Sequence, residues 1–178
     1  MKVSAIFFIL MMFFGFHSNG QNGFVWTADM VEGWGLSIDG DNKYDSSDYL
    51  GAIKDYSKSI ELFPGSAQTY FRRGYSKFQL GDREGALVDY NRAIDRDSTA
   101  SNYFVSRAMA RAVLLDLKGA LQDYNKAIEL DPSRGGVYRQ RGMVKIYLGD
   151  KEGGCGDLSK AGEFGIAKAY EQIRTHCN

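Results

Sequence analysis

One sequence pattern recurs every 34 positions through most of this 178-residue chain. Small residues, glycines, aspartates and tyrosines each recur at that step. The recurring positions are Ala52, Ala86, Ala120 and Gly154; Gly51, Gly85, Gly119 and Gly153; Asp48, Asp82, Asp116 and Asp150; Asp55, Asp89, Asp123 and Asp157; and Tyr56, Tyr90, Tyr124 and then Leu158. Residues 67–100 and 101–134 are identical at 12 of 34 positions. Agreement at a fixed spacing is typical of a repeat architecture, in which each unit packs against its neighbours.

Each repeat is predicted to form two helices. In the second unit, apolar and small residues recur at helical spacing from Tyr70 to Leu80, and the pattern ends at Gly81. Asp82 stands where a second helix needs an N-cap, so we expect the aspartates of its column to cap the second helices. The glycine column falls in the first turn of that helix, where glycine is costly. We expect these glycines to allow close backbone packing.

These landmarks resemble the tetratricopeptide repeat (TPR) family, whose 34-residue unit is a helix–turn–helix. The second unit matches through Tyr70, Gly74, Ala86, Tyr90 and Ala93, and the third through Ala120, Tyr124, Ala127 and Pro132. The first unit is weak before Asp48, and the fourth departs at Gly154 and Leu158. The resemblance implies an all-α, right-handed helical-hairpin solenoid over residues 33–178. Its units would be residues 33–66, 67–100, 101–134 and 135–165, followed by a capping helix over residues 166–177.

An arginine recurs in the first helix of three units, and an aspartate of the second helix follows each one at the same spacing. The pairs are Arg73 with Asp89, Arg107 with Asp123, and Arg141 with Asp157. If the two helices are antiparallel, each pair forms an ion pair inside its unit, although a row of arginines would also suit phosphate or carboxylate recognition. The first unit has Asp39 in place of the arginine, so the pairing is predicted to fail there.

The two ends of the chain carry separate signals. Residues 1–20 have the pattern of a cleaved signal peptide, with Lys2, an almost entirely apolar run from Val3 to Phe16, and cleavage before Gln21. The alternative is a membrane anchor, but a spanning helix needs roughly 20 apolar residues and this run is shorter. The chain is therefore expected to be exported, either periplasmic or secreted, with no stable membrane span after cleavage. Residues 21–32 would form a leader.

Export makes a disulfide possible between the only two cysteines, Cys155 and Cys177. They lie on either side of a turn near Gly165, at similar distances along two predicted helices, so a hairpin would bring the two sulfurs together. The alternative is two free thiols.

The composition argues against several functions. The chain has 22 basic and 22 acidic residues, which gives no basic field for nucleic acid. It has two histidines, and it lacks a phosphate-binding loop, a nucleophile motif and paired zinc-binding cysteines. We expect no catalytic residue, no metal and no cofactor. The acidic run from Asp39 to Asp48 does not fit a calcium loop, because Tyr44 and Leu50 replace the required glycine and acid.

The TPR resemblance implies a concave groove, lined by the first helices, for a protein or peptide partner. The candidate groove residues are Phe71, Arg72, Tyr75 and Phe78; Asn102, Val105 and Met109; and Arg139, Gln140, Met143 and Tyr147. The alternative for each is packing against the next repeat. The clamp that binds terminal carboxylates in some TPR proteins is not expected, because only Arg72 has a suitable side chain. The expected function is a non-catalytic scaffold or adaptor outside the cytoplasm; an accessory subunit of an envelope enzyme or transport assembly is the alternative.

Overall fold

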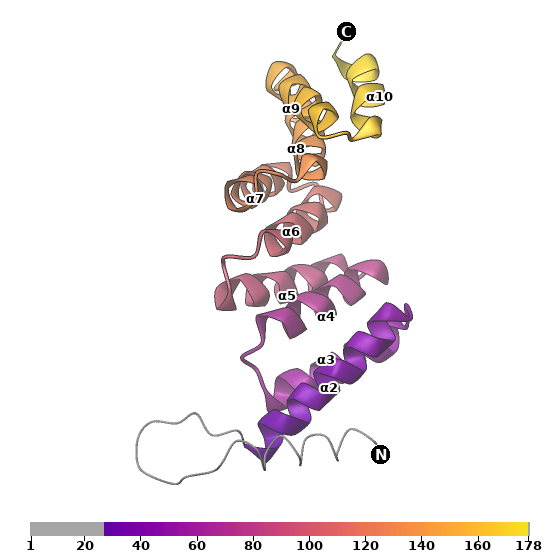
Figure 1. The fold of residues 1–178 in the computed structure, drawn as a ribbon, viewed down its shortest axis with the longest axis vertical. Helices are drawn as coiled ribbons and strands as arrows, with labels where there is room; N and C mark the ends of the chain where they lie inside the picture. The colour runs from indigo at the N-terminus through magenta and orange to yellow at the C-terminus, as the bar shows by residue number, and fades with distance from the viewer. Residues whose placement is uncertain (1–26, 178) are drawn as a thin grey trace, which may run out of the picture.

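The computed structural model describes residues 27–177, and all of the regular structure in that range is α-helical. The helices are α2 (Ala28–Asp45), α3 (Tyr49–Leu62), α4 (Ala67–Gln79), α5 (Arg83–Arg96), α6 (Ser101–Val113), α7 (Leu117–Leu130), α8 (Gly135–Tyr147), α9 (Lys151–Glu163) and α10 (Ala167–His176). Consecutive helices pack together as hairpins, and the hairpins stack along one long axis (Figure 1). The predicted all-α solenoid of helical hairpins is confirmed.

The N-terminal end of the stack differs from the sequence prediction. The predicted signal peptide and the first half of the predicted leader, residues 21–26, lie outside the described residues. The last part of that leader is helical, because α2 begins at Ala28. Thr27 caps this helix by accepting a hydrogen bond from the Met30 amide at 3.2 Å. The first hairpin is therefore α2 with α3, and its first helix is complete.

An aspartate caps the second helix of every hairpin, as predicted. Each of the four carboxylates accepts a hydrogen bond of 2.9–3.0 Å from the glycine amide three residues later, in Asp48, Asp82, Asp116 and Asp150. A Cβ atom on any of those glycines would collide with the capping carboxylate. The expectation that the glycine column serves packing between helices is wrong, since the capping aspartate is what crowds this position.

The turn between the two helices needs a left-handed backbone. Gly81 and Gly149 have φ values of +87° and +92° there, which glycine adopts without a steric penalty. The equivalent residue of the third unit is Leu115, with φ +66°, and that of the first unit is Ser47, with φ +64°. The left-handed conformation costs a residue with a side chain roughly 1–2 kcal/mol. Leu115 is thus a departure from the repeat that the fold does not favour.

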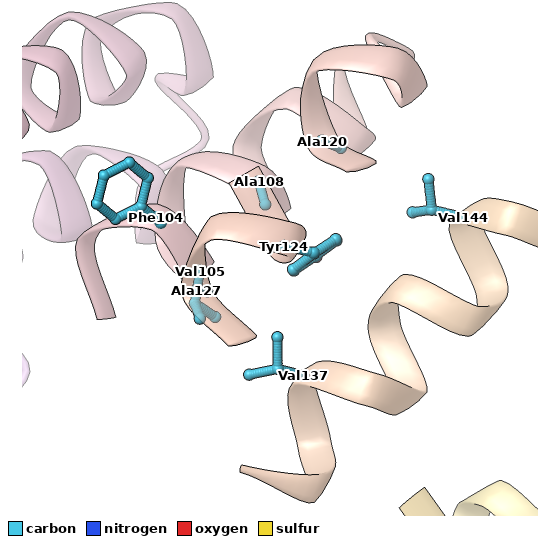
Figure 2. Close-up of a cluster of buried hydrophobic side chains, with 8 residues drawn as sticks. All are labelled: Phe104, Val105, Ala108, Ala120, Tyr124, Ala127, Val137 and Val144. Atoms are coloured by element: carbon cyan, nitrogen blue, oxygen red, sulfur yellow. The ribbon is translucent and has the colours of Figure 1, made fainter. Parts of the chain in front are cut away.

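Alanines and tyrosines of the second helices make a large part of the core. Ala86, Tyr90, Ala120 and Tyr124 are all at most 2% exposed. The largest cluster joins α6 and α7 to α8 and consists of Phe104, Val105, Ala108, Ala120, Tyr124, Ala127, Val137 and Val144. Figure 2 shows Tyr124 extending from its helix toward Val137 and Val144 on the next one. Tyr124 therefore helps to stack its unit on the following unit.

Gly154, where the repeat otherwise has alanine, marks a close approach of α8 and α9. A Cβ atom on Gly154 would lie 2.7 Å from the carbonyl oxygen of Gly142, and one on Gly142 would lie 2.8 Å from that of Gly154. Backbone atoms cannot move aside as a side chain can. The fourth unit therefore requires glycine at both crossing positions.

We predict that Gly154→Ala, which restores the usual residue of the repeat, destabilises the protein by about 1–2 kcal/mol. The collision with the Gly142 carbonyl outweighs the gain of about 1 kcal/mol in helix propensity. Gly156→Ala is the matched control, because Gly156 is exposed in the same helix and has open space around it. It should stabilise by about 0.5–1 kcal/mol. Urea unfolding measures both, and a stabilising Gly154→Ala would contradict the close approach.

The predicted arginine–aspartate pairs form inside the hairpins. Arg73 donates to both carboxylate oxygens of Asp89, at 2.9 and 2.6 Å, and Lys77 lies 2.8 Å from the same carboxylate. Asp89 is 0% exposed. The pattern repeats with Arg107, Arg111 and Asp123, and with Arg141, Lys145 and Asp157. The interpretation of these arginines as structural is confirmed.

Two parts of this network were not predicted. The free Nη1 of each arginine donates back to the preceding hairpin, to Ser57, Asn91 or Asn125. In the first unit, Lys43 lies 2.6 Å from Asp55, and this hydrogen bond raises the pKa of Lys43. The arginine pairing is absent from the first unit, as predicted, and Lys43 takes its place beside Asp55. This second cation also recurs at the period of the repeat, as Lys43, Lys77, Arg111 and Lys145.

We predict that Asp89→Ala lowers the free energy of unfolding by about 3 kcal/mol, since it leaves Arg73 and Lys77 facing each other without their shared carboxylate. Asp95→Ala in the same helix is the control, because Asp95 is exposed. It should change stability by no more than about 0.5 kcal/mol. Thermal and urea unfolding would show the difference, and equal effects would mean that the buried network adds nothing.

Helix α10 closes the C-terminal end by packing on α9. Ala169 is fully buried, and the Tyr170 hydroxyl donates to the Gly162 carbonyl at 3.0 Å. Cys155 on α9 and Cys177 just after α10 form a disulfide, with Cα atoms 5.8 Å apart. The bond fastens the end of the capping helix to the last hairpin.

We predict that the double variant Cys155→Ser, Cys177→Ser is less stable by about 3 kcal/mol, because opening this loop restores the entropy of the unfolded chain. Amide hydrogens of α10 should exchange faster while those of α5 keep their protection. Treating the unmodified protein with a reducing agent should reproduce both effects. Unchanged exchange in α10 would show that packing alone holds the cap.

Candidate functional site

Three of the candidate groove residues take part in packing between units. The Phe71 ring lies 4.8 Å from the Tyr103 ring and 5.9 Å from the Tyr90 ring. Phe78 packs against the cluster of Ala86, Tyr90 and Ala110, and Val105 is only 8% exposed. For these three side chains, contact with the neighbouring repeat is the structural role.

Arg72 and Tyr75 belong to a cluster at the junction of the first two hairpins. Arg72 lies 3.3 Å from Asp41 and 5.4 Å above the Tyr44 ring. The Tyr75 ring contacts the Tyr44 ring edge-on at 5.4 Å. Tyr56 donates its hydroxyl to Asp41 at 2.7 Å, and burial raises the pKa of Tyr56. Arg72 therefore already has a carboxylate partner within the chain.

The middle of the predicted groove is less enclosed. Asn102 is half-buried near the start of α6, and Met109 is exposed on the same helix. Neither side chain has a hydrogen bond to another of the residues 27–177. These two remain accessible, but they do not form a cavity by themselves.

The four candidates of the fourth unit line a pocket between α6, α7 and α8. Its volume is about 330 Å³, and its walls are Arg139, Gln140, Met143, Val144 and Tyr147 from α8 with Ala112, Leu115, Leu117 and Tyr124 from the preceding hairpin. The walls from the preceding hairpin were not predicted. Leu115 could have been noticed in the sequence, because it replaces the glycine of Gly81 and Gly149. Tyr124 was assigned to the repeat pattern and therefore to the core.

The polar groups of this pocket lack partners within the described chain. Across residues 27–177, no hydrogen bond or ion pair is made by the side chains of Arg139, Gln140 or Tyr124. Burial raises the pKa of Tyr124, and the charge of nearby Arg139 opposes that rise. The Tyr124 phenol therefore stays protonated at neutral pH and can donate. The pocket combines apolar walls with three hydrogen-bond donors.

The rest of the described chain offers few alternatives. Among residues 27–177, no group of three histidine, cysteine, aspartate or glutamate side chains is placed to hold a metal ion. None of the helices within that range is long and apolar enough to cross a membrane. His176, the histidine of this range, lies at the end of α10, away from the pocket residues.

Comparison with known proteins gives the fold a family context. Residues 67–99 match the family model described as "Tetratricopeptide repeat". No curated protein matches the chain. Among solved structures, MamA is 22% identical with a TM-score of 0.76, covering 81% of this chain and 80% of MamA.

Two further solved structures with this fold are described as peptide-binding. The first TPR of Spaghetti (RPAP3), bound to the HSP90 peptide SRMEEVD, is 22% identical with a TM-score of 0.65, over 67% of this chain and 95% of that one. YrrB, described as a TPR protein with an unusual peptide-binding site, is 17% identical with a TM-score of 0.73, over 80% and 74%. These matches support the resemblance to the tetratricopeptide repeat family, and the fold is that of TPR solenoids.

Proposed function

We propose that this chain is a non-catalytic scaffold that binds a segment of a partner protein along its first helices. The observation that carries the proposal is the pocket between α6, α7 and α8, where Arg139, Gln140 and Tyr124 present donors with no partner in the described chain. Buried or half-buried donors without partners are costly in a free protein, and a bound backbone or carboxylate would satisfy them. Two structures with this fold support the same use of the solenoid, since one holds a bound peptide and the other is described as having a peptide-binding site.

A catalytic role is disfavoured by how the buried acids are held. Asp89, Asp123 and Asp157 each contact two cations of the first helix in their own hairpin. A carboxylate held by two cations is tied to the packing of the two helices. These residues therefore suit a structural role rather than proton transfer.

We also propose that the scaffold works outside the cytoplasm, in the periplasm or after secretion. The Cys155–Cys177 disulfide supports this location, since such bonds persist in oxidising compartments. The signal-like pattern of residues 1–20 supports it as well. In that location the disulfide keeps the capping helix α10 fastened to α9.

A photocrosslinking amino acid at Tyr147 tests the proposed binding face. Tyr147 is 68% exposed at the rim of the pocket, and Val88, 57% exposed on α5, is the matched control position. We expect the crosslinker at Tyr147 to capture one defined partner, and the crosslinker at Val88 not to capture that partner. Mass spectrometry identifies the partner, which is then purified for binding measurements.

We predict that the double variant Tyr75→Ala, Met143→Ala weakens the purified partner's affinity by about tenfold while helical circular dichroism is unchanged. Both residues are candidate groove residues of the first helices, so removing their side chains takes contact area from the binding face. Val88→Ala should leave the affinity unchanged. Equal affinity for the double variant would place the binding surface elsewhere on the protein.

A further inference from the structure

We infer that the pocket between α6, α7 and α8 holds one large apolar side chain of an extended partner segment, and that Arg139 pairs with an acidic side chain of the same segment. This inference rests on the proposed function and adds the chemistry of the partner. It is carried by Leu115, by the pairing of the other arginines, and by the charge of the first helices.

Leu115 supplies the first reason. Its side chain is 82% exposed, and its backbone is left-handed at a turn where two other units have glycine. Both features oppose folding, because the exposed leucine gains nothing from burial and the left-handed backbone crowds its Cβ atom. The side chain lines the pocket beside Met143 and Tyr147. An apolar group of a partner would bury this leucine, which otherwise stands in water.

Arg139 supplies the second reason. The other arginines of α4, α6 and α8 all contact carboxylates of the chain: Arg72 with Asp41, Arg73 with Asp89, Arg107 and Arg111 with Asp123, and Arg141 with Asp157. Among the described residues, Arg139 has no such partner, and it is only half-exposed at the pocket wall. A half-buried guanidinium has lost part of its hydration, and a carboxylate compensates for this loss best because it can accept two parallel hydrogen bonds.

The distribution of charge along the first helices gives the segment a direction. Helix α2 carries five acidic residues and one lysine, whereas α8 carries no acidic residue. Asp157 already pairs with Arg141 and Lys145 of α8, so Arg139 supplies the cation that a partner would meet there. An acidic side chain is therefore attracted at the α8 end of the stack and repelled at the α2 end. In an extended chain, residues two apart point to the same side, about 7 Å from each other. The apolar and acidic side chains are accordingly expected two residues apart.

The remaining donors suit a peptide backbone. The Tyr124 hydroxyl and the Gln140 amide both belong to the pocket wall. Backbone carbonyls of an extended segment have no partners of their own and can accept from such groups. An apolar small molecule would leave these donors unsatisfied.

Selection of random peptides on the purified protein tests the inference. Peptides enriched on the unchanged protein should carry a large apolar residue two positions from an aspartate or glutamate. Arg139→Glu should reverse the preference, enriching lysine or arginine at that position. It should also weaken binding of the original acidic peptides by about tenfold or more. Arg92→Glu is the matched control, because Arg92 is exposed on α5, and it should leave both results unchanged.

Leu115→Gly separates binding from folding. It relieves the left-handed strain, so the midpoint of thermal unfolding should rise, while the selected peptides should bind at least fivefold more weakly because one apolar wall is gone. Unchanged affinity with raised stability would overturn the role assigned to Leu115.

The possible failures are distinguishable. If no peptide is enriched on any of the proteins, the proposed binding function fails as well. Enrichment without the apolar–acidic spacing, or without the reversal in Arg139→Glu, would overturn this inference and leave the scaffold proposal standing. If phenylbutyrate displaced the bound peptides as strongly as an unlabelled copy of the same peptide does, the pocket would be a site for small organic acids. That result would also overturn the inference.

Discussion

The buried aspartate of each second helix is the contact on which the stacking of this protein depends. In the middle units it accepts two hydrogen bonds from an arginine and contacts a second cation one helical turn further on. The same arginine donates backwards to Ser57 or Asn91, so one guanidinium joins two helices of its own hairpin and a helix of the preceding hairpin. A buried charge is tolerated only when its hydrogen bonds are complete. The network therefore fixes the angle and register at which one hairpin meets the next.

Much of this arrangement could be predicted from the sequence, because repetition carries the information. A residue that recurs in several units together with its partner indicates a contact from the sequence alone, as Arg107 and Asp123 do. The capping aspartates followed from the same logic, since a helix start needs an acceptor for its free amides. The all-helical class, the hairpins and the capping helix can be predicted from apolar residues at helical spacing and from the points where that spacing ends.

The features that could not be predicted are contacts whose existence depends on distances in the folded structure. The glycines at the helix starts were assigned to packing, because nothing in the sequence says that a Cβ atom there would meet the capping carboxylate. The pairing of Lys43 with Asp55 could not be predicted from the arginine column, because the first unit has no arginine there. Phe71 and Val105 had the right helix and the right spacing for a groove, yet the rotation of α4 and α6 turns them toward the core.

The departures from the repeat are where the pocket lies, and this has a physical reason. A repeated position makes the same intramolecular contact only where its partner position repeats as well, and its side chain is then occupied by the fold. Tyr56, for example, donates to Asp41, whereas the equivalent Tyr124 has no acceptor in the described chain, because Met109 stands in its unit where the first unit has that aspartate. Leu115 and Arg139 likewise occupy positions where other units have Gly81 and Phe71. Side chains that the repeat does not use are the ones left for a partner, and in this solenoid they converge between α6, α7 and α8.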